Sequence, residues 1–105
     1  MAFRVDVSRR AERDIEDAFE YIRTRAPLNA IRWRDALQRR LEALQTNPEG
    51  FGLAPEDEVA KANVRQLLYG RYRILYTVRE KTVFVITVRH GARLFLTADD
   101  IDAID

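Results

Sequence analysis

Much of the fold follows from two adjacent strand-length segments, residues 72–79 and 82–89, which are apolar on both faces. Only Glu80 and Lys81 separate them, which predicts an antiparallel hairpin. Because Glu-Lys is not the Asn-Gly type of tight-turn pair, we expect a slightly longer loop between the strands. A sheet with two apolar faces needs cover on both, so the remaining chain or a partner must supply it.

The pairing of the two strands depends on the position of the turn. If the turn is centred between Glu80 and Lys81, Arg73 lies opposite Val88. One face then carries Arg73, Leu75, Thr77, Phe84, Ile86, Val88 and His90. His90 is a diagonal neighbour of Arg73 in this register, about 7–8 Å away between Cα atoms. A shift of one residue would place these two side chains on opposite faces.

Two amphipathic helices precede this hairpin and can cover one of its faces. Ser8 occupies an N-cap position, and Pro27 can open the second helix as its first residue. Asn47-Pro48 ends the second helix. The apolar stripes of the two helices are Ala11, Ile15, Ala18, Phe19 and Ile22, and then Ala30, Trp33, Leu37, Leu41 and Leu44. We expect the helices to form an antiparallel hairpin.

Two further strands complete the expected sheet. Residues 3–7 alternate apolar and polar side chains, and residues 64–69 form a strand-like run between a loop at residues 48–60 and a turn at Gly70. The expected fold class is α+β, with an N-terminal strand and an antiparallel helical hairpin packed on one face of a mostly antiparallel four-stranded sheet. We expect residues 1–105 to form one domain, with 94–105 as an acidic C-terminal tail.

Composition excludes several kinds of site. The sequence has no cysteine and one histidine, so disulfides and thiolate chemistry are excluded and neither a metal nor a cofactor is expected. The N-terminal residues lack the apolar segment of a signal peptide, and no apolar run reaches the roughly 20 residues of a membrane helix. We therefore expect a soluble cytoplasmic protein without a membrane partner.

Positive charge is concentrated in one part of the chain, although the formal net charge is only +1. Residues 63–93 contain Glu80 as their single anion, while the compensating acids lie at residues 56–58 and in the tail. The cations of this basic block are Arg65, Arg71, Arg73, Arg79, Lys81, Arg89 and Arg93. Such a block favours an anionic partner, either nucleic acid or an acidic protein segment, but a solvated basic rim has the same pattern.

The sharpest local motif is His-Gly-Ala-Arg at residues 90–93. His90 could exchange a proton near neutral pH while Arg73, Arg89 or Arg93 neutralises a phosphate. The alternative is structural, with His90 capping the strand through a hydrogen bond to the backbone. Residue types alone favour this alternative, because a lone histidine without a partner seldom marks catalysis.

Other side chains near the basic block also allow two interpretations. Arg65, Arg71 and Arg73 surround a turn and could bind phosphate, or an intramolecular ion pair could join them to the acidic loop at residues 56–58. Glu56 could act as a general base, or the loop acids could simply be solvated. Tyrosines in this region could stack on bases but are better explained as packing residues; they are Tyr69, Tyr72 and Tyr76.

Two helices of this length cover only one face of the hairpin. The other face leaves an apolar patch formed by Leu75, Phe84, Ile86 and Val88, unless the tail folds over it. Exposed apolar patches rimmed by charge usually mark protein interaction sites. We therefore expect a homodimer partner or a separate protein to cover this patch.

The chain resembles the RelE/ParE superfamily of type II toxin–antitoxin toxins over residues 3–93. The resemblance depends on the order and spacing of residues 14–17, Tyr21-Ile22, Pro27, Ala30, Trp33, Leu37, Asn47-Pro48, residues 64–65, 70–76 and 88–93. Residues 70–74 followed by residues 90–93 look closest to the ParE-like, plasmid stabilisation branch. The resemblance implies a growth-inhibiting toxin that forms a hetero-oligomer with a cognate antitoxin, which would cover Leu75, Phe84, Ile86 and Val88.

The branch determines the implied target. A ParE-like toxin would bind DNA gyrase without chemistry of its own. The residues that would bind the target or a phosphate are Arg65, Arg71, Arg73, Arg89, His90 and Arg93. We expect Arg73, His90 and Arg93 to cluster near one end of the sheet, with Arg65 and Arg71 close by.

Two alternatives to a gyrase inhibitor remain. A RelE-like toxin would cut mRNA on the ribosome, with Arg73, His90 and Glu56 as candidate catalytic residues. The sequence departs from such nucleases, because the tyrosine that ends their site is missing after His90 and a lysine-rich surface is absent. The second alternative is a protein-interaction module without toxicity.

Overall fold

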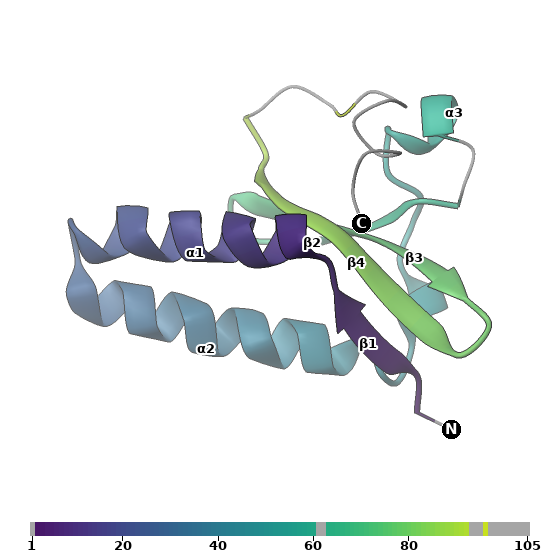
Figure 1. The fold of residues 1–105 in the computed structure, drawn as a ribbon, viewed down its shortest axis with the longest axis horizontal. Helices are drawn as coiled ribbons and strands as arrows, with labels where there is room; N and C mark the ends of the chain where they lie inside the picture. The colour runs from purple at the N-terminus through teal and green to yellow at the C-terminus, as the bar shows by residue number, and fades with distance from the viewer. Residues whose placement is uncertain (1, 61–62, 93–95, 97–105) are drawn as a thin grey trace.

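The computed structural model describes residues 2–60, 63–92 and 96 and has two layers, a pair of helices and a sheet (Figure 1). The elements in chain order are β1 (Arg4–Val7), α1 (Arg9–Arg23), α2 (Pro27–Ala43), the 3₁₀ helix η1 (Pro48–Gly50), α3 (Asp57–Ala60), β2 (Arg65–Tyr69), β3 (Tyr72–Arg79) and β4 (Thr82–His90). The strand order is β1-β4-β3-β2, with β1 parallel to β4 and the other neighbours antiparallel. This arrangement confirms the expected α+β fold. Among the described residues, no helix has the length and apolar character needed to cross a membrane.

Local signals in the sequence set where the helices begin. The Ser8 hydroxyl accepts a hydrogen bond from the Ala11 backbone N–H at 3.0 Å, as expected for an N-cap. Pro27 is the first residue of α2, where its missing N–H leaves no helical hydrogen bond unmade. The two helices run antiparallel on one face of the sheet (Figure 1), which confirms the predicted helical hairpin.

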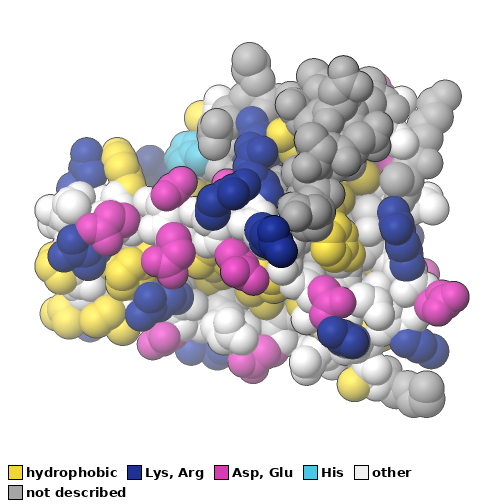
Figure 2. All heavy atoms as spheres, viewed as in Figure 1, with side chains coloured by type: hydrophobic (Ala, Val, Ile, Leu, Met, Phe, Trp, Pro, Cys, Tyr) yellow, Lys and Arg dark blue, Asp and Glu magenta, His cyan; other side chains and the backbone are white. Residues whose placement is uncertain are grey.

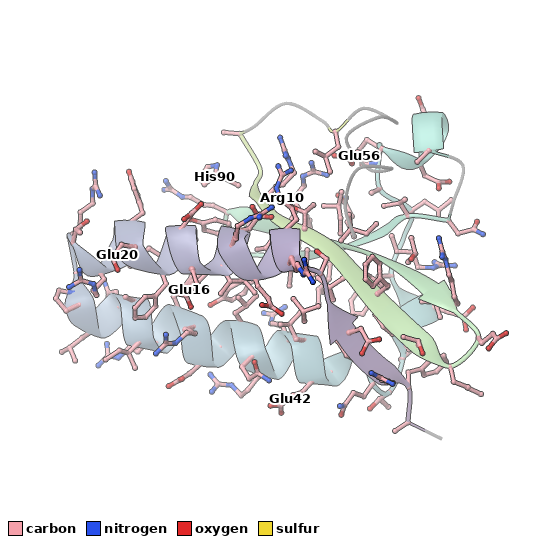
Figure 3. The ribbon with its side chains drawn as sticks, viewed as in Figure 1. Arg10, Glu16, Glu20, Glu42, Glu56 and His90 are labelled. Atoms are coloured by element: carbon pink, nitrogen blue, oxygen red, sulfur yellow. The ribbon has the colours of Figure 1, made fainter. Side chains whose placement is uncertain are left out.

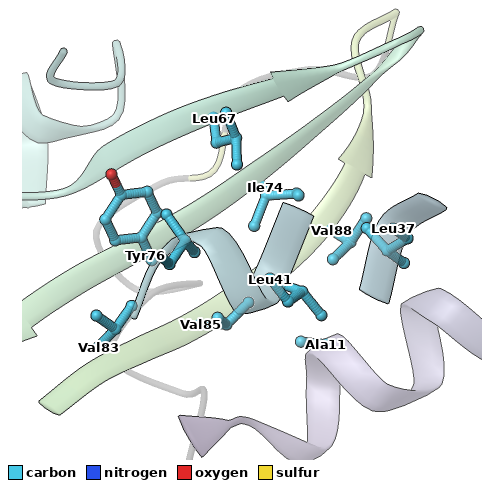
Figure 4. Close-up of a cluster of buried hydrophobic side chains, with 10 residues drawn as sticks. Ala11, Leu37, Leu41, Leu67, Ile74, Tyr76, Val83, Val85 and Val88 are labelled. Carbon is cyan, nitrogen blue, oxygen red and sulfur yellow. The ribbon is translucent and has the colours of Figure 1, made fainter. Parts of the chain in front are cut away.

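The main core lies between the helices and the sheet (Figure 4). Its buried side chains are Ala11, Leu37, Leu41, Leu44, Leu67, Ile74, Tyr76, Val83, Val85 and Val88. Tyr76 is the largest of them, and its hydroxyl donates a hydrogen bond to the Pro48 carbonyl. Burial raises the pKa of the Tyr76 hydroxyl to about 12. Tyr76 is therefore a packing residue, as predicted.

The hairpin of β3 and β4 contains a bulge. Near the turn the register is as predicted, with Val85 opposite Tyr76. One step further Thr87 lies opposite Leu75, which leaves Ile86 as an extra residue in β4. Every pair beyond this point is shifted by one residue relative to the prediction.

The bulge changes which side chains share a face. Arg73 pairs with Arg89, and Tyr72 pairs with His90. Arg73 and His90 therefore lie on opposite faces, and the prediction that they are diagonal neighbours was wrong. Val88 was also assigned to the wrong face, because it lies in the main core under the helices.

Contacts from the start of α1 account for the bulge. The Ser8 hydroxyl donates a hydrogen bond to the Ile86 carbonyl at 2.6 Å. Asp14 accepts hydrogen bonds from the Thr87 hydroxyl and from the Val88 backbone N–H, the latter at 3.2 Å. The irregular part of β4 thus satisfies its polar groups through α1, and a regular hairpin would lose these bonds.

The turn between β3 and β4 is also tighter than predicted. Arg79 pairs with Thr82, so Glu80 and Lys81 alone form the connection. Glu80 adopts a left-handed backbone conformation, with φ of 55°. This conformation is uncommon for a residue with a side chain, and the paired strands on either side hold it in place.

The second face of the sheet is covered by the chain itself, so the expected open patch was wrong. A second buried cluster contains Ala54, Val64, Leu75, Ile86 and Leu96, with Phe84 partly buried against it. Among the described residues, the segment between η1 and β2 supplies Ala54 and Val64 to this cover, and Leu96 adds to it. The Ala54 backbone N–H donates to the Val64 carbonyl at 2.7 Å, and the Gln66 N–H donates to the Gly52 carbonyl at 3.1 Å. The prediction treated residues 48–60 of this segment as a loop.

Candidate functional site

A buried ion pair on the second face joins two of the residues considered as catalytic. Arg73 Nη1 donates to Glu56 Oε1 at 3.0 Å, and Arg73 Nη2 donates to Glu56 Oε2 at 2.7 Å. Arg73 Nη1 also donates to Gln66 Oε1 at 3.1 Å. The exposed fractions of the Arg73 and Glu56 side chains are 8% and 0%. The alternative of an intramolecular ion pair with the acidic loop is confirmed for Arg73.

The acids of this loop hold the covering segment in place. The Leu96 backbone N–H donates to Glu56 Oε2 at 3.2 Å, and the Val64 backbone N–H donates to Asp57 Oδ1 at 2.8 Å. Burial by itself would raise the pKa of Glu56, but hydrogen bonds from Arg73 and from backbone N–H groups outweigh it and lower that pKa. An ionised carboxylate with both oxygens bonded is poorly suited to act as a general base.

His90 lies on the opposite face, at the end of β4 and next to α1 (Figure 3). Its ring meets Tyr72 edge-on, with 5.3 Å between the ring centroids. His90 Nδ1 accepts a hydrogen bond from the Ala92 backbone N–H at 3.1 Å. In the neutral ring the hydrogen therefore sits on Nε2. The structural interpretation of His90 is confirmed, because its side chain does cap the end of the strand.

A groove of about 300 Å³ lies beside His90, between α1 and the sheet. Its lining residues are Asp14, Asp17, Ala18, Tyr21, Tyr72, Val88 and His90. Asp14 is engaged by β4 and also by Arg10 Nε at 3.3 Å. No hydrogen bond or ion pair joins Asp17 to another described residue. The groove combines one engaged and one available carboxylate with two tyrosine rings and an imidazole.

The arginines of the basic block do not gather at one site. Arg65 Nη1 donates to the Phe51 carbonyl at one end of β2, whereas Arg71 is exposed in the turn at the other end. Arg89 is buried on the second face, opposite Arg73 in the strand register. Arg71, Arg73 and His90 lie near the same end of the sheet, as expected, but Arg73 and His90 are on opposite faces. Arg65 lies towards the other end, so these residues do not form one cluster. Arg93, the remaining member, lies outside the described residues.

The comparisons with known proteins agree with this fold. A family model described as the ParE toxin of the type II toxin–antitoxin system parDE matches residues 5–95. The chain belongs to this family. The membership confirms the resemblance to RelE/ParE toxins inferred from the sequence.

Two solved structures share the ParE-like fold of this chain. A chain from the chromosomal ParDE toxin–antitoxin system of P. aeruginosa has a TM-score of 0.69 at 16% identity, covering 85% of this chain and 96% of that one. A chain from the RelBE2 toxin–antitoxin complex of Mycobacterium tuberculosis has a TM-score of 0.58 at 18% identity, covering 86% and 99%. No curated protein sequence matches the chain.

Sequence reasoning missed the groove of this ParE-family chain. Asp14, Asp17 and Tyr21 are three and four residues apart on α1, so they lie along one side of the helix. This polar strip beside the apolar stripe was the available signal. The place of His90 beside this strip could not be foreseen, because it depends on the bulge in β4. In the described part of the chain, no three histidine, aspartate or glutamate side chains converge as metal ligands would.

Proposed function

We propose that this ParE-family chain stops bacterial growth by binding DNA gyrase in the cytoplasm, without catalytic chemistry of its own. One observation carries this choice over the nuclease alternative. Arg73 and Glu56 lie on one face of the sheet, and His90 lies on the other. A nuclease needs its acid–base group and its phosphate-binding group around the same reacting phosphate. The three candidate residues do not surround one point.

The buried state of Arg73 and Glu56 supports the same choice. Each of the two carboxylate oxygens accepts a hydrogen bond from the guanidinium, under a loop that leaves little of either side chain exposed. Separating one partner from a buried ion pair costs about 3–5 kcal/mol. An RNA phosphate would have to displace Glu56 against that cost, whereas binding to gyrase requires no such displacement.

We also propose neutralisation by a cognate antitoxin, which family membership and the RelBE2 toxin–antitoxin complex support. Of the four residues predicted to bind it, Leu75, Ile86 and Val88 are buried. Phe84 is partly exposed and borders a groove of about 440 Å³ shared with Arg79, Glu80 and Thr82. An antitoxin can therefore reach Phe84 directly, but it can reach Leu75 or Ile86 only after the covering segment moves away.

Two assays on the purified protein test the proposed target. We expect inhibition of supercoiling by gyrase and no cleavage of mRNA on programmed ribosomes. Site-specific mRNA cuts that disappear in an Arg73→Ala variant, but persist in an Arg79→Ala control, would contradict the proposal and favour the endoribonuclease. Expression that leaves growth unaffected would favour the non-toxic interaction module.

Neutralisation is tested by co-expression with the protein encoded in the adjacent reading frame. We expect growth to be restored and a stable complex to form. A Phe84→Ala variant should weaken that complex, while an exposed change on the helical side, such as Glu16→Gln, should not. Unchanged affinity of Phe84→Ala would place the antitoxin elsewhere on the molecule.

A further inference from the structure

The groove beside His90 carries a carboxylate that is available to a ligand. Asp17 lines it, and no hydrogen bond or ion pair joins Asp17 to another described residue. The neighbouring Asp14 differs, because β4 and Arg10 already occupy it. Acidic side chains also lie along the face of α1 that is turned to the viewer in the space-filling view (Figure 2). An available carboxylate in a concave site attracts a cation.

Two tyrosine rings in the same groove favour the same class of ligand. Tyr21 is 59% exposed, and Tyr72 lies across the groove with its ring edge-on to His90. The faces of aromatic rings are negative and attract ammonium and guanidinium groups within about 6 Å. Tyr21 also lies in the last turn of α1, where the helix dipole adds a partial negative charge.

Within the chain, the Tyr21 ring already accepts a guanidinium. The Arg25 guanidinium carbon lies 3.8 Å from the centroid of the Tyr21 ring. Arg25 Nη1 also donates a hydrogen bond to the Tyr21 carbonyl at 3.0 Å. Tyr21 remains largely exposed despite this contact. Arg25 thus competes with any further cation at the ring, because it is a like charge and covers part of the surface.

We propose that the groove formed by Asp17, Tyr21, Tyr72 and His90 binds an arginine side chain of a partner protein. The guanidinium pairs with the Asp17 carboxylate and stacks on a tyrosine ring. A volume of about 300 Å³ is at the lower end of ligand pockets, so it suits one side chain. Arginine is favoured over lysine because its planar, weakly hydrated group stacks on aromatic rings and bonds a carboxylate through two nitrogens.

The test uses the full-length protein and the small probe N-acetyl-L-arginine amide. Trp33 is the single tryptophan, and its ring centroid lies 5.3 Å from that of Tyr72, so its fluorescence reports on the groove. The matched ligand is N-acetyl-L-citrulline amide, which has nearly the same shape without the charge. Shifts of the backbone amide signals in NMR spectra locate the binding site. Because neither gyrase nor an antitoxin takes part, the result is independent of the proposed function.

Three variants separate the groove from the rest of the surface. Asp17→Asn should weaken arginine binding about fivefold, a ratio that corresponds to roughly 1 kcal/mol. Glu16→Gln, an exposed change on the same helix outside the groove (Figure 3), should leave it unchanged. Arg25→Ala should strengthen it, because the competing guanidinium is removed from Tyr21. Thermal unfolding of each variant confirms that the fold is intact.

Several outcomes would overturn the proposal. Binding of citrulline as tight as that of arginine would show that charge is not recognised. An unchanged affinity in Asp17→Asn, or NMR shifts away from α1 and Tyr72, would place the binding elsewhere. A dissociation constant for arginine weaker than about 100 mM, equivalent to less than roughly 1.4 kcal/mol of binding free energy, would leave the groove without a useful affinity for this group.

Discussion

The guanidinium of Arg73 and the carboxylate of Glu56 are joined by two hydrogen bonds, of 3.0 and 2.7 Å, beneath the segment that covers the second face of the sheet. Leu96, the last described residue, donates its backbone N–H to the same carboxylate. The pair therefore connects three distant parts of the chain: β3, the loop before α3, and Leu96. It closes a face that the two helices cannot reach.

The ion pair should matter for stability mainly when one partner is removed. We expect Arg73→Met to lower the free energy of unfolding by about 3–5 kcal/mol, because the Glu56 carboxylate stays buried without its cation. Urea denaturation measures the change. The double variant Arg73→Met/Glu56→Leu should recover much of the loss, since no charge then remains buried. Equal stability of the single and double variants would argue against this interpretation.

The same pair should make stability depend on pH in the acid range. The pKa of Glu56 is lower in the folded protein than in the unfolded chain. Its stabilising contribution is therefore fully present above the unfolded pKa of about 4.3 and is lost as the pH falls through the folded value. At higher pH the urea midpoint of the unchanged protein should exceed that of Glu56→Gln. This difference should shrink below about pH 4 in measurements at a series of pH values. A difference that stays constant to lower pH would contradict the assignment.

A second pH window is expected at the alkaline end, from Tyr76. Its pKa is raised to about 12 by burial, above the unfolded value of about 10. Stability is therefore lost as the pH rises from 10 to 12, by up to about 3 kcal/mol. Tyr76→Phe should remove this contribution, and at neutral pH it should cost about 1–3 kcal/mol because the Pro48 carbonyl loses its donor. Tyr21→Phe, at an exposed tyrosine, is the control. It should lose stability between pH 10 and 12 just as the unchanged protein does.

Substitutions of Asp14 and Asp17, two aspartates on the same helix, can be compared to test how α1 holds the bulge in β4. Asp14→Ala removes the acceptor of the Val88 N–H and the Thr87 hydroxyl, and should cost about 1–3 kcal/mol of unfolding free energy. Asp17→Ala should change it by less than about 0.5 kcal/mol, because Asp17 has no such bonds within the described residues. Hydrogen exchange should show faster opening of β4 in the first variant only. Similar exchange in both would mean that Asp14 is not needed for the bulge.

The helices and strands were predictable because their signals are local. The N-cap at Ser8 and the first-turn proline at Pro27 act within one helical turn, and the alternation along β3 is visible over a few residues. The apolar stripes of the two helices also predicted that these helices cover one face of the sheet. The interactions that form these features are between residues close together in the sequence.

The site was not predictable in the same way because its causes are distant in sequence. The bulge depends on a hydrogen bond between residues 78 positions apart, from the Ser8 hydroxyl to the Ile86 carbonyl. The burial of Arg73 depends on a loop acid 17 positions away. A register counted from the turn contains no information on either contact. It therefore placed His90 beside Arg73 and left the groove along α1 unnoticed.

Arg71 is the arginine of the basic block that we propose contacts the target. It is exposed in the turn between β2 and β3, close to the end of β4, where its carbonyl accepts the Gly91 N–H at 2.7 Å. A hydrogen bond to a charged group contributes about 1.5–3 kcal/mol, so Arg71→Ala should weaken the proposed inhibition of gyrase about tenfold or more. Arg79→Ala removes another exposed arginine, at the opposite end of β3, and should have little effect. The concentration that halves supercoiling activity measures both. If the two variants lose the same activity, the target is recognised by overall charge and not by this end of the sheet.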